Sequence, residues 1–253
     1  MHSERAVGGR HSDSPVLMLQ VGGVSALLLA AAYLAIIALF ATVGAPPGGA
    51  QARLEYHATT AATWWAIVAL SVITDLLFVP VAVALYAALR GAGESAMRAA
   101  TVFTLLFVVL DLAVTWPAYA SLISLSQQYA TVTTVDERAV IVAAAGYPSA
   151  VLSSPMQSIN SILTLSIGIL LTGLVTVRGA FGRATGTLGV TTGLVGIASV
   201  AHTALTGELS PLAIAASVLT IAWLVLIGVS LSRPRRSSDR AKRAAPGALA
   251  VVD

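Results

Sequence analysis

Two aspartates stand inside long apolar stretches, where a charge is most costly. Asp75 lies near the middle of "WWAIVALSVITDLLFVPVAVALYAALR", which begins at Trp64, and Asp111 lies within "TVFTLLFVVLDLAVTWP", which begins at Thr101. A carboxylate at the centre of a bilayer costs about 2.5–3.5 kcal/mol on insertion scales. No lysine or arginine stands near either acid within its apolar stretch. We therefore expect that at neutral pH at least one of them holds a proton, or that the pair shares one.

Polar residues recur at helical spacing around both acids. Ser71 precedes Asp75 by four residues, and Thr104 and Thr115 stand seven before and four after Asp111, so each acid shares a helix face with hydroxyls. Two later apolar stretches carry similar stripes, of Gln157, Ser161 and Thr164, and of Thr192, Ser199, His202 and Thr203. The sequence therefore predicts a polar site at the middle of the membrane, formed by Asp75, Asp111, Ser71, Thr104, Thr115 and His202.

The composition indicates a membrane protein. Of the 253 residues, 57% are hydrophobic and only 10% are charged, and the mean hydropathy is +0.87, whereas a soluble domain carries about 25% charged residues. The apolar residues form continuous blocks of about twenty, which is the length of a membrane-spanning helix. The predicted fold is an all-α, polytopic membrane helix bundle with six spans, at about 18–43, 61–89, 99–124, 158–177, 186–207 and 211–231.

The basic residues predict the orientation of these spans. Of the 14 lysines and arginines, all but Arg53 and Arg138 fall in connections on one side of the bundle. Because such residues concentrate in cytoplasmic loops, we expect both termini to be cytoplasmic. This divides the chain into a cytoplasmic segment over 1–17, a transmembrane domain over 18–231 and a basic, disordered cytoplasmic tail over 232–253. We expect an interfacial aromatic belt near the outer face, formed by Trp64, Trp65, Trp116, Tyr119 and Tyr129.

The long outer loop, residues 126–157, has a helix-start signal of its own. Thr134 and Glu137 fit a capping box, and the apolar run after them predicts a helix of about nine residues in the interface. Pro148 and Pro155 are expected to end that helix.

Four motifs resemble a known family: "TDLLF" with "LYAALR" in the second span, "GYPSAV" before the fourth, and "GLVTVRGAFGRATGTLGVTTGLVGI" from Gly173. They are similar to those of the domain-of-unknown-function family 4386, a group of bacterial multipass membrane proteins, over about residues 20–230. The resemblance implies a six-helix membrane protein of unassigned activity and brings no catalytic residues with it. It also implies the bacterial cytoplasmic (inner) membrane as the location.

Small residues predict the packing of the fifth span. Gly186, Gly189, Gly193 and Gly196 repeat at intervals of three, four and three, which leaves one smooth face for close helix contact. The chain has no cysteine, and no cluster of histidines and carboxylates, so we expect no metal and no cofactor.

Three functions fit these features. The first is proton-linked transport of a small or lipophilic solute through the aspartate site. The second is a membrane-embedded enzyme that uses an aspartate as general acid on a hydrophobic, isoprenoid-like substrate. The third is a non-catalytic scaffold or partner subunit, in which the acids hold helices together. The partners that this architecture allows are membrane lipids, such a substrate and further copies of the chain in a homo-oligomer. Nucleic acid is not among them, because the basic residues lie where topology requires them.

Overall fold

A computed structural model describes residues 14–178, 181–207 and 210–233, and every regular element in these ranges is helical. The predicted segment over 1–17 and the basic tail over 232–253 lie mostly outside the described residues. The helices follow in the order α1 (Ser14–Val43), α2 (Ala50–Leu110), η1 (Asp111–Thr115), α3 (Trp116–Thr131), α4 (Val135–Ser153), α5 (Pro155–Ser158), η2 (Ile159–Leu163), α6 (Thr164–Val177), α7 (Arg183–Thr206) and α8 (Pro211–Ser232). The elements η1 and η2 are single π-helical turns set into longer helices.

The all-helical fold is confirmed for the described residues, and five helical stretches among them are long and apolar enough to cross a membrane. They are Val16–Val43, Ala50–Thr131, Pro155–Val177, Arg183–Thr206 and Pro211–Ser232.

The second stretch is a hairpin of two helical arms. Its 82 residues would extend about 120 Å as one straight helix, four times the thickness of the hydrocarbon layer. The backbone leaves helical geometry at Gly93 (φ −178°, ψ 76°). On either side of that break the chain runs back along itself, since the rings of Phe78 and Phe107 meet edge to face with centroids 5.4 Å apart.

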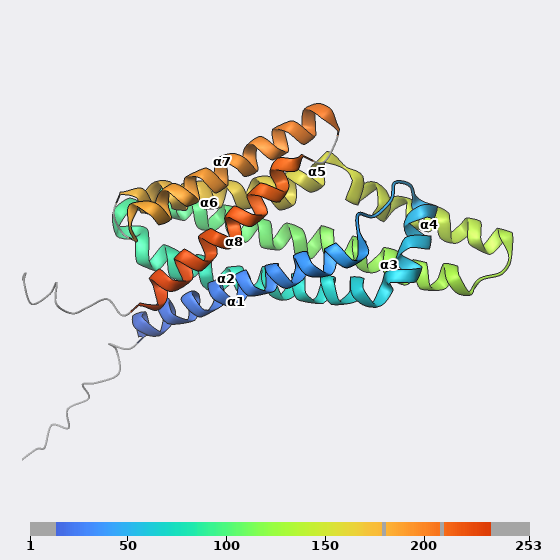
Figure 1. Ribbon diagram of the computed structural model, residues 1–253, viewed down its shortest axis with the longest axis horizontal. Helices are drawn as coiled ribbons and strands as arrows, with labels where there is room; N and C mark the ends of the chain where they lie inside the picture. The colour runs from blue at the N-terminus through green and yellow to red at the C-terminus, as the bar shows by residue number, and fades with distance from the viewer. Residues whose placement is uncertain (1–13, 179–180, 208–209, 234–253) are drawn as a thin grey trace, which may run out of the picture.

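The described ends of the chain lie together at one end of the bundle. In Figure 1, α1 begins and α8 ends at the same end, and the hairpin of α2 also turns there. The helices α3 and α4 extend beyond the others at the opposite end.

The helix in the long loop is longer than the sequence predicts. Thr134 caps it as expected, because its hydroxyl accepts a hydrogen bond from the Glu137 amide. However, α4 continues through Pro148 to Ser153, so the expectation that Pro148 ends it is wrong, and only Pro155 marks a boundary. A proline removes one backbone hydrogen bond, but Pro148 is buried where α4 packs on the bundle, and the helix continues past it.

Both arginines on the predicted outer side stabilise loops. The Arg53 guanidinium donates to the carbonyl of Pro47 at 3.0 Å and the carbonyl of Ser149 at 3.0 Å, so it joins the α1–α2 connection to α4. The Arg138 guanidinium donates to the Val132 carbonyl at 3.0 Å and lies over the ring of Tyr129.

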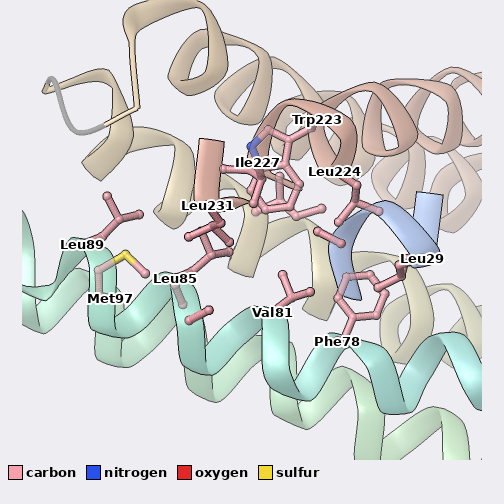
Figure 2. Packing of buried hydrophobic residues seen from close by; sticks show 14 of the residues in the cluster. Leu29, Phe78, Val81, Leu85, Leu89, Met97, Trp223, Leu224, Ile227 and Leu231 are labelled. Atoms are coloured by element: carbon pink, nitrogen blue, oxygen red, sulfur yellow. The ribbon is translucent and has the colours of Figure 1, made fainter. Parts of the chain in front are cut away.

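The main hydrophobic core fills the end of the bundle near the chain termini. Large apolar side chains of α8 pack there against the first arm of α2 and against α1 (Figure 2): Trp223, Leu224, Ile227 and Leu231 meet Phe78, Val81, Leu85, Leu89 and Leu29. At this end glycines also bring the helices close. A Cβ on Gly228 would stand 3.0 Å from the Gly23 carbonyl, and one on Gly22 would stand 3.0 Å from the Pro80 carbonyl.

The four glycines that the sequence singles out lie between α7 and its neighbours, and all of them are buried. A Cβ on Gly189 would be 3.1 Å from the Gly173 Cα of α6, and one on Gly193 would be 2.7 Å from the Ser166 carbonyl. A Cβ on Gly186 would meet the backbone of Val177, and one on Gly196 the side chain of Ser166. The absence of side chains therefore lets α7 approach the backbone of α6 directly. We refer to this contact as the glycine seam.

Candidate functional site

A cavity of about 330 Å³ lies within the bundle, beyond the main core, and both aspartates line it. Its walls come from α1, both arms of the α2 hairpin, the start of α3, η2, α6 and the first half of α8. Small side chains create this space, because α8 presents alanines, Ser217 and Thr220 here and large residues only from Ile221 onward. The lining residues are Tyr33, Ile36, Ile37, Phe40, Ser71, Thr74, Asp75, Phe107, Asp111, Trp116, Ser161, Ile162, Leu165, Ser166, Ile169, Ala213, Ala216, Ser217, Thr220 and Ile221.

Asp111 is held by a network of hydroxyl and amide groups. Its Oδ1 accepts a hydrogen bond from Thr115 Oγ1 at 2.7 Å, and a second from Ser161 Oγ on η2. Gln157 Nε2 donates to Ser161 Oγ at 2.9 Å and to Thr115 Oγ1 at 3.0 Å. The network joins the second arm of the hairpin to the start of the α6 stretch, and it fixes one carboxylate oxygen.

Asp75 is held by an aromatic donor. Trp116 Nε1 donates to its Oδ2 at 2.5 Å, which links the two arms of the hairpin. Asp75 is only 1% exposed and Asp111 4%. Both acids are therefore shielded from the surface of the bundle, although they line its internal cavity.

Each carboxylate keeps one oxygen without a protein donor. Among the described residues, no hydrogen bond reaches Oδ1 of Asp75 or Oδ2 of Asp111. No lysine or arginine lines the cavity, and the one ion pair within the described ranges joins Arg98 and Glu94 on the exposed surface. The pair therefore has acceptor capacity and negative potential without a cationic partner.

Both π-turns lie at this site. In η1, which begins at Asp111, the Trp116 amide bonds to the Asp111 carbonyl, five residues back. Pro117 follows directly, and a proline ring clashes with the carbonyl four residues before it, so the wider turn relieves that clash. In η2, which contains Ser161, the Thr164 amide bonds to the Ile159 carbonyl, and the Thr164 hydroxyl donates to the Asn160 carbonyl that this leaves free. Single π-turns inside α-helices occur frequently at functional sites.

Aromatic rings close the cavity along the bundle axis. On the side of the main core, Phe107 meets Phe78 edge to face. On the opposite side, Trp116 stacks on Tyr119 with centroids 5.8 Å apart, Tyr119 on Trp64 at 4.9 Å, and Trp64 meets Phe40 at 5.3 Å. We refer to these four residues as the aromatic roof.

The structure places the predicted site residues in two groups. Asp75, Asp111 and Ser71 line the cavity, and Thr115 joins them through its bond to Asp111. Thr104 does not, because it lies two turns, about 10 Å, from Asp111. It lines a small separate void of about 10 Å³ and donates to the Ala100 carbonyl. His202 does not either, because it lies near the end of α7, where its Nδ1 is 3.5 Å from Thr206 Oγ1.

The positions of the aromatic residues differ most from the prediction, which was an interfacial belt. Trp64 is fully buried, and Trp116 and Tyr119 stack inside the bundle, so these three do not form an interfacial belt, whereas Trp65 is 39% exposed. Trp116, which donates to Asp75, and Tyr33 both lie in the cavity wall, and the sequence does not predict either of them as part of the site. The signal for Trp116 was the proline after it, since Pro117 forces a local departure from the regular helix.

Within the described ranges, no three histidine, cysteine or acidic side chains lie close enough together to hold a metal ion. Of the acids in the described part of the chain, Asp75 and Asp111 alone line the cavity.

Comparison with known proteins identifies no relative: no family model, no curated protein and no solved structure matches the chain. The resemblance to domain-of-unknown-function family 4386 therefore stays a prediction from the motifs.

Proposed function

We propose that this chain is a six-span protein of the bacterial inner membrane, with both termini in the cytoplasm, that carries a small or lipophilic solute in exchange for protons. The single observation behind the activity is the cavity itself, in which two carboxylates each keep one oxygen free. Buried carboxylates inside a membrane protein are costly and typically belong to ion or substrate pathways. The two π-turns, one of which contains Asp111 and the other its partner Ser161, support the same assignment.

The six-span arrangement counts the two arms of the α2 hairpin separately. Labelling of single cysteines tests it, since the chain has no cysteine of its own. A cysteine at Ala92, beside the hairpin turn, is expected to react with a membrane-impermeant maleimide only from the cytoplasmic side. A cysteine at Gln128, near the end of α3, is expected to react only from outside. Labelling of both positions from the same side would overturn the proposed topology.

Infrared spectroscopy tests the proton linkage. As the medium is acidified through neutrality, the protein in nanodiscs is expected to gain intensity in the carboxylic acid stretch, and the Asp75→Asn, Asp111→Asn double variant is expected to lose this change. The matched control is Asp136→Asn, which changes an exposed acid in the first turn of α4. A titration that is unchanged in the double variant would reject proton exchange at this site.

One observation favours the enzymatic alternative. The cavity wall includes Tyr33, Phe40, Phe107 and Trp116, and aromatic faces stabilise a positive charge of the kind that forms when an acid protonates an alkene. Incubation with a polyprenol in deuterated water tests this function. Deuterium in the product, lost with Asp75→Asn or Asp111→Asn, would support acid catalysis in place of transport.

A further inference from the structure

The cavity is partly open, and α1 and α8 form one of its sides. These two helices touch near the chain termini, where Gly23 and Gly228 meet, and they diverge toward the other end of the bundle (Figure 1). Ile37 of α1 and Ser217 of α8 both line the cavity, and both are exposed, whereas Asp75 and Asp111 deeper in the cavity are buried. They mark the mouth of the opening.

The mouth faces lipid. Ile37 precedes the end of α1 by six residues and Ser217 follows the start of α8 by six, so each lies about 9 Å from its helix end. That depth is within the hydrocarbon of one leaflet. The neighbouring exposed residues are apolar, with Leu34 57% exposed, Ile214 73% and Val218 55%. A molecule that uses this opening must dissolve in the bilayer.

The interior favours a positive charge. The two carboxylates meet no cation among the described residues, and four aromatic rings surround them. Carboxylate oxygens accept hydrogen bonds from an ammonium group, and aromatic faces attract cations. An anionic ligand would meet repulsion from an ionised carboxylate of the pair, and a neutral ligand could not take the place of the positive charge of a bound proton.

We propose that the ligand is an amphiphilic ammonium compound, which enters from the lipid between α1 and α8 and binds its cationic group to Asp75 and Asp111. This inference rests on the proposed function and names its substrate class. Binding of a monocation to a pair that holds protons releases one proton, which gives the exchange its coupling. The other titratable groups around the pair are Tyr33 of α1 and Tyr119 of α3, whereas the segments of α6 and α8 that line the cavity carry none.

Three pyrene probes of the same shape test the charge preference. The protein in nanodiscs is titrated with 1-pyrenemethylammonium, 1-pyrenemethanol or 1-pyrenecarboxylate, and energy transfer from tryptophan to pyrene reports binding. Empty nanodiscs give the signal from lipid partitioning. We expect saturable binding of the ammonium probe, at least tenfold tighter than the alcohol, with release of a proton to an indicator dye. The Asp75→Asn, Asp111→Asn double variant is expected to remove that preference.

Equal binding of ammonium and alcohol, or a preference that survives in the double variant, would overturn the charge assignment. Aspartate-dependent binding of the alcohol alone would also overturn it but would leave the proposed solute carrier intact. If no probe saturates while the infrared titration still depends on the pair, the ligand class fails and proton exchange stands. If both measurements fail, the proposed function fails with the inference.

Kinetics test the lateral entrance. Ile37→Trp and Ser217→Trp add bulk at the mouth and are expected to slow both association and dissociation of the ammonium probe at least fivefold. Leu34→Trp is the matched control, because Leu34 is exposed to lipid and does not line the cavity. Equal rates in all three variants would overturn entry between α1 and α8.

Discussion

The glycine seam between α6 and α7 and the opening between α1 and α8 both depend on small residues, yet one is closed and the other open. In the seam, small residues face each other or face backbone, as Gly189 faces Gly173. In the opening, the small residues of α8 face large ones of α1, including Ile36, Ile37 and Phe40. The small residues of α7 therefore let two backbones meet, whereas those of α8 leave a cavity beside the large side chains of α1.

The polar residues of the glycine seam and those of the cavity also differ in what they bond to. In the glycine seam, the helices are in contact through their backbones. The threonines near it, such as Thr172 and Thr192, donate hydrogen bonds to carbonyls of their own helices. In the cavity, the hydroxyls of Thr115 and Ser161 instead donate to a carboxylate on a neighbouring turn or helix. Bulk added to the seam should therefore be costly, whereas bulk added to the cavity should be tolerated.

The largest effect is expected in the seam. Gly193→Val would place a Cβ 2.6 Å from the Leu170 Cβ and 2.7 Å from the Ser166 carbonyl, so it should lower the free energy of unfolding by about 1–3 kcal/mol or more. Equilibrium unfolding in bicelles measures this. Gly146→Ala in α4 is the control, because a Cβ there meets nothing within 4 Å. A neutral Gly193→Val would show that the seam is not closely packed.

Removal of the Asp111 carboxylate should have the next largest effect on stability. Asp111→Leu leaves the Ser161 and Thr115 hydroxyls without their acceptor, which should cost about 1–3 kcal/mol in the same unfolding measurement. Asp111→Asn keeps an acceptor oxygen and should cost less than about 1 kcal/mol. If the asparagine variant is as unstable as the leucine variant, the carboxylate is holding helices together, as the scaffold alternative requires.

The indole donor to Asp75 should contribute less. Trp116→Phe removes the 2.5 Å hydrogen bond but keeps an aromatic ring against Tyr119, so we expect a loss of about 0.5–1.5 kcal/mol. The thermal midpoint of the variant measures this, and infrared spectra should show a change in the Asp75 carboxyl signal. An unchanged carboxyl signal would contradict the assigned donor.

The smallest effect is expected from filling the cavity. Ala213→Phe adds a ring to the wall of an open space, so the free energy of unfolding should change by no more than about 0.5 kcal/mol. Binding of the ammonium probe should fall at the same time. A destabilisation as large as that of Gly193→Val would show that α1 and α8 normally close on each other.

The sequence predicts the helices well and the site only in part. Apolar length places four of the six predicted spans within a few residues of a described helical stretch, because lipid requires continuous helical hydrogen bonding. The other two, 61–89 and 99–124, fall inside the single stretch Ala50–Thr131, which extends beyond both of them. Helical spacing correctly groups Asp111 with Thr115, but it also assigns Thr104 to the polar site, which is wrong. Residues that share a helix face can still lie at different depths along the bundle. Trp116 was assigned to the interface from its residue type. Its hydrogen bond to Asp75 forms because the two arms of the hairpin lie side by side. A local sequence pattern does not predict such a contact between distant residues.

The two π-turns also connect the cavity to the glycine seam. The bond between Asp111 and Ser161 joins η1 to η2, and the segment of α6 that packs in the seam follows η2 directly. A ligand that takes the place of the Ser161 hydroxyl at Asp111 would release the first turns of this stretch while the seam holds the rest of α6 in place. Electron spin resonance on a label at Ile162 tests this, because such a release predicts a change in its distance to α2.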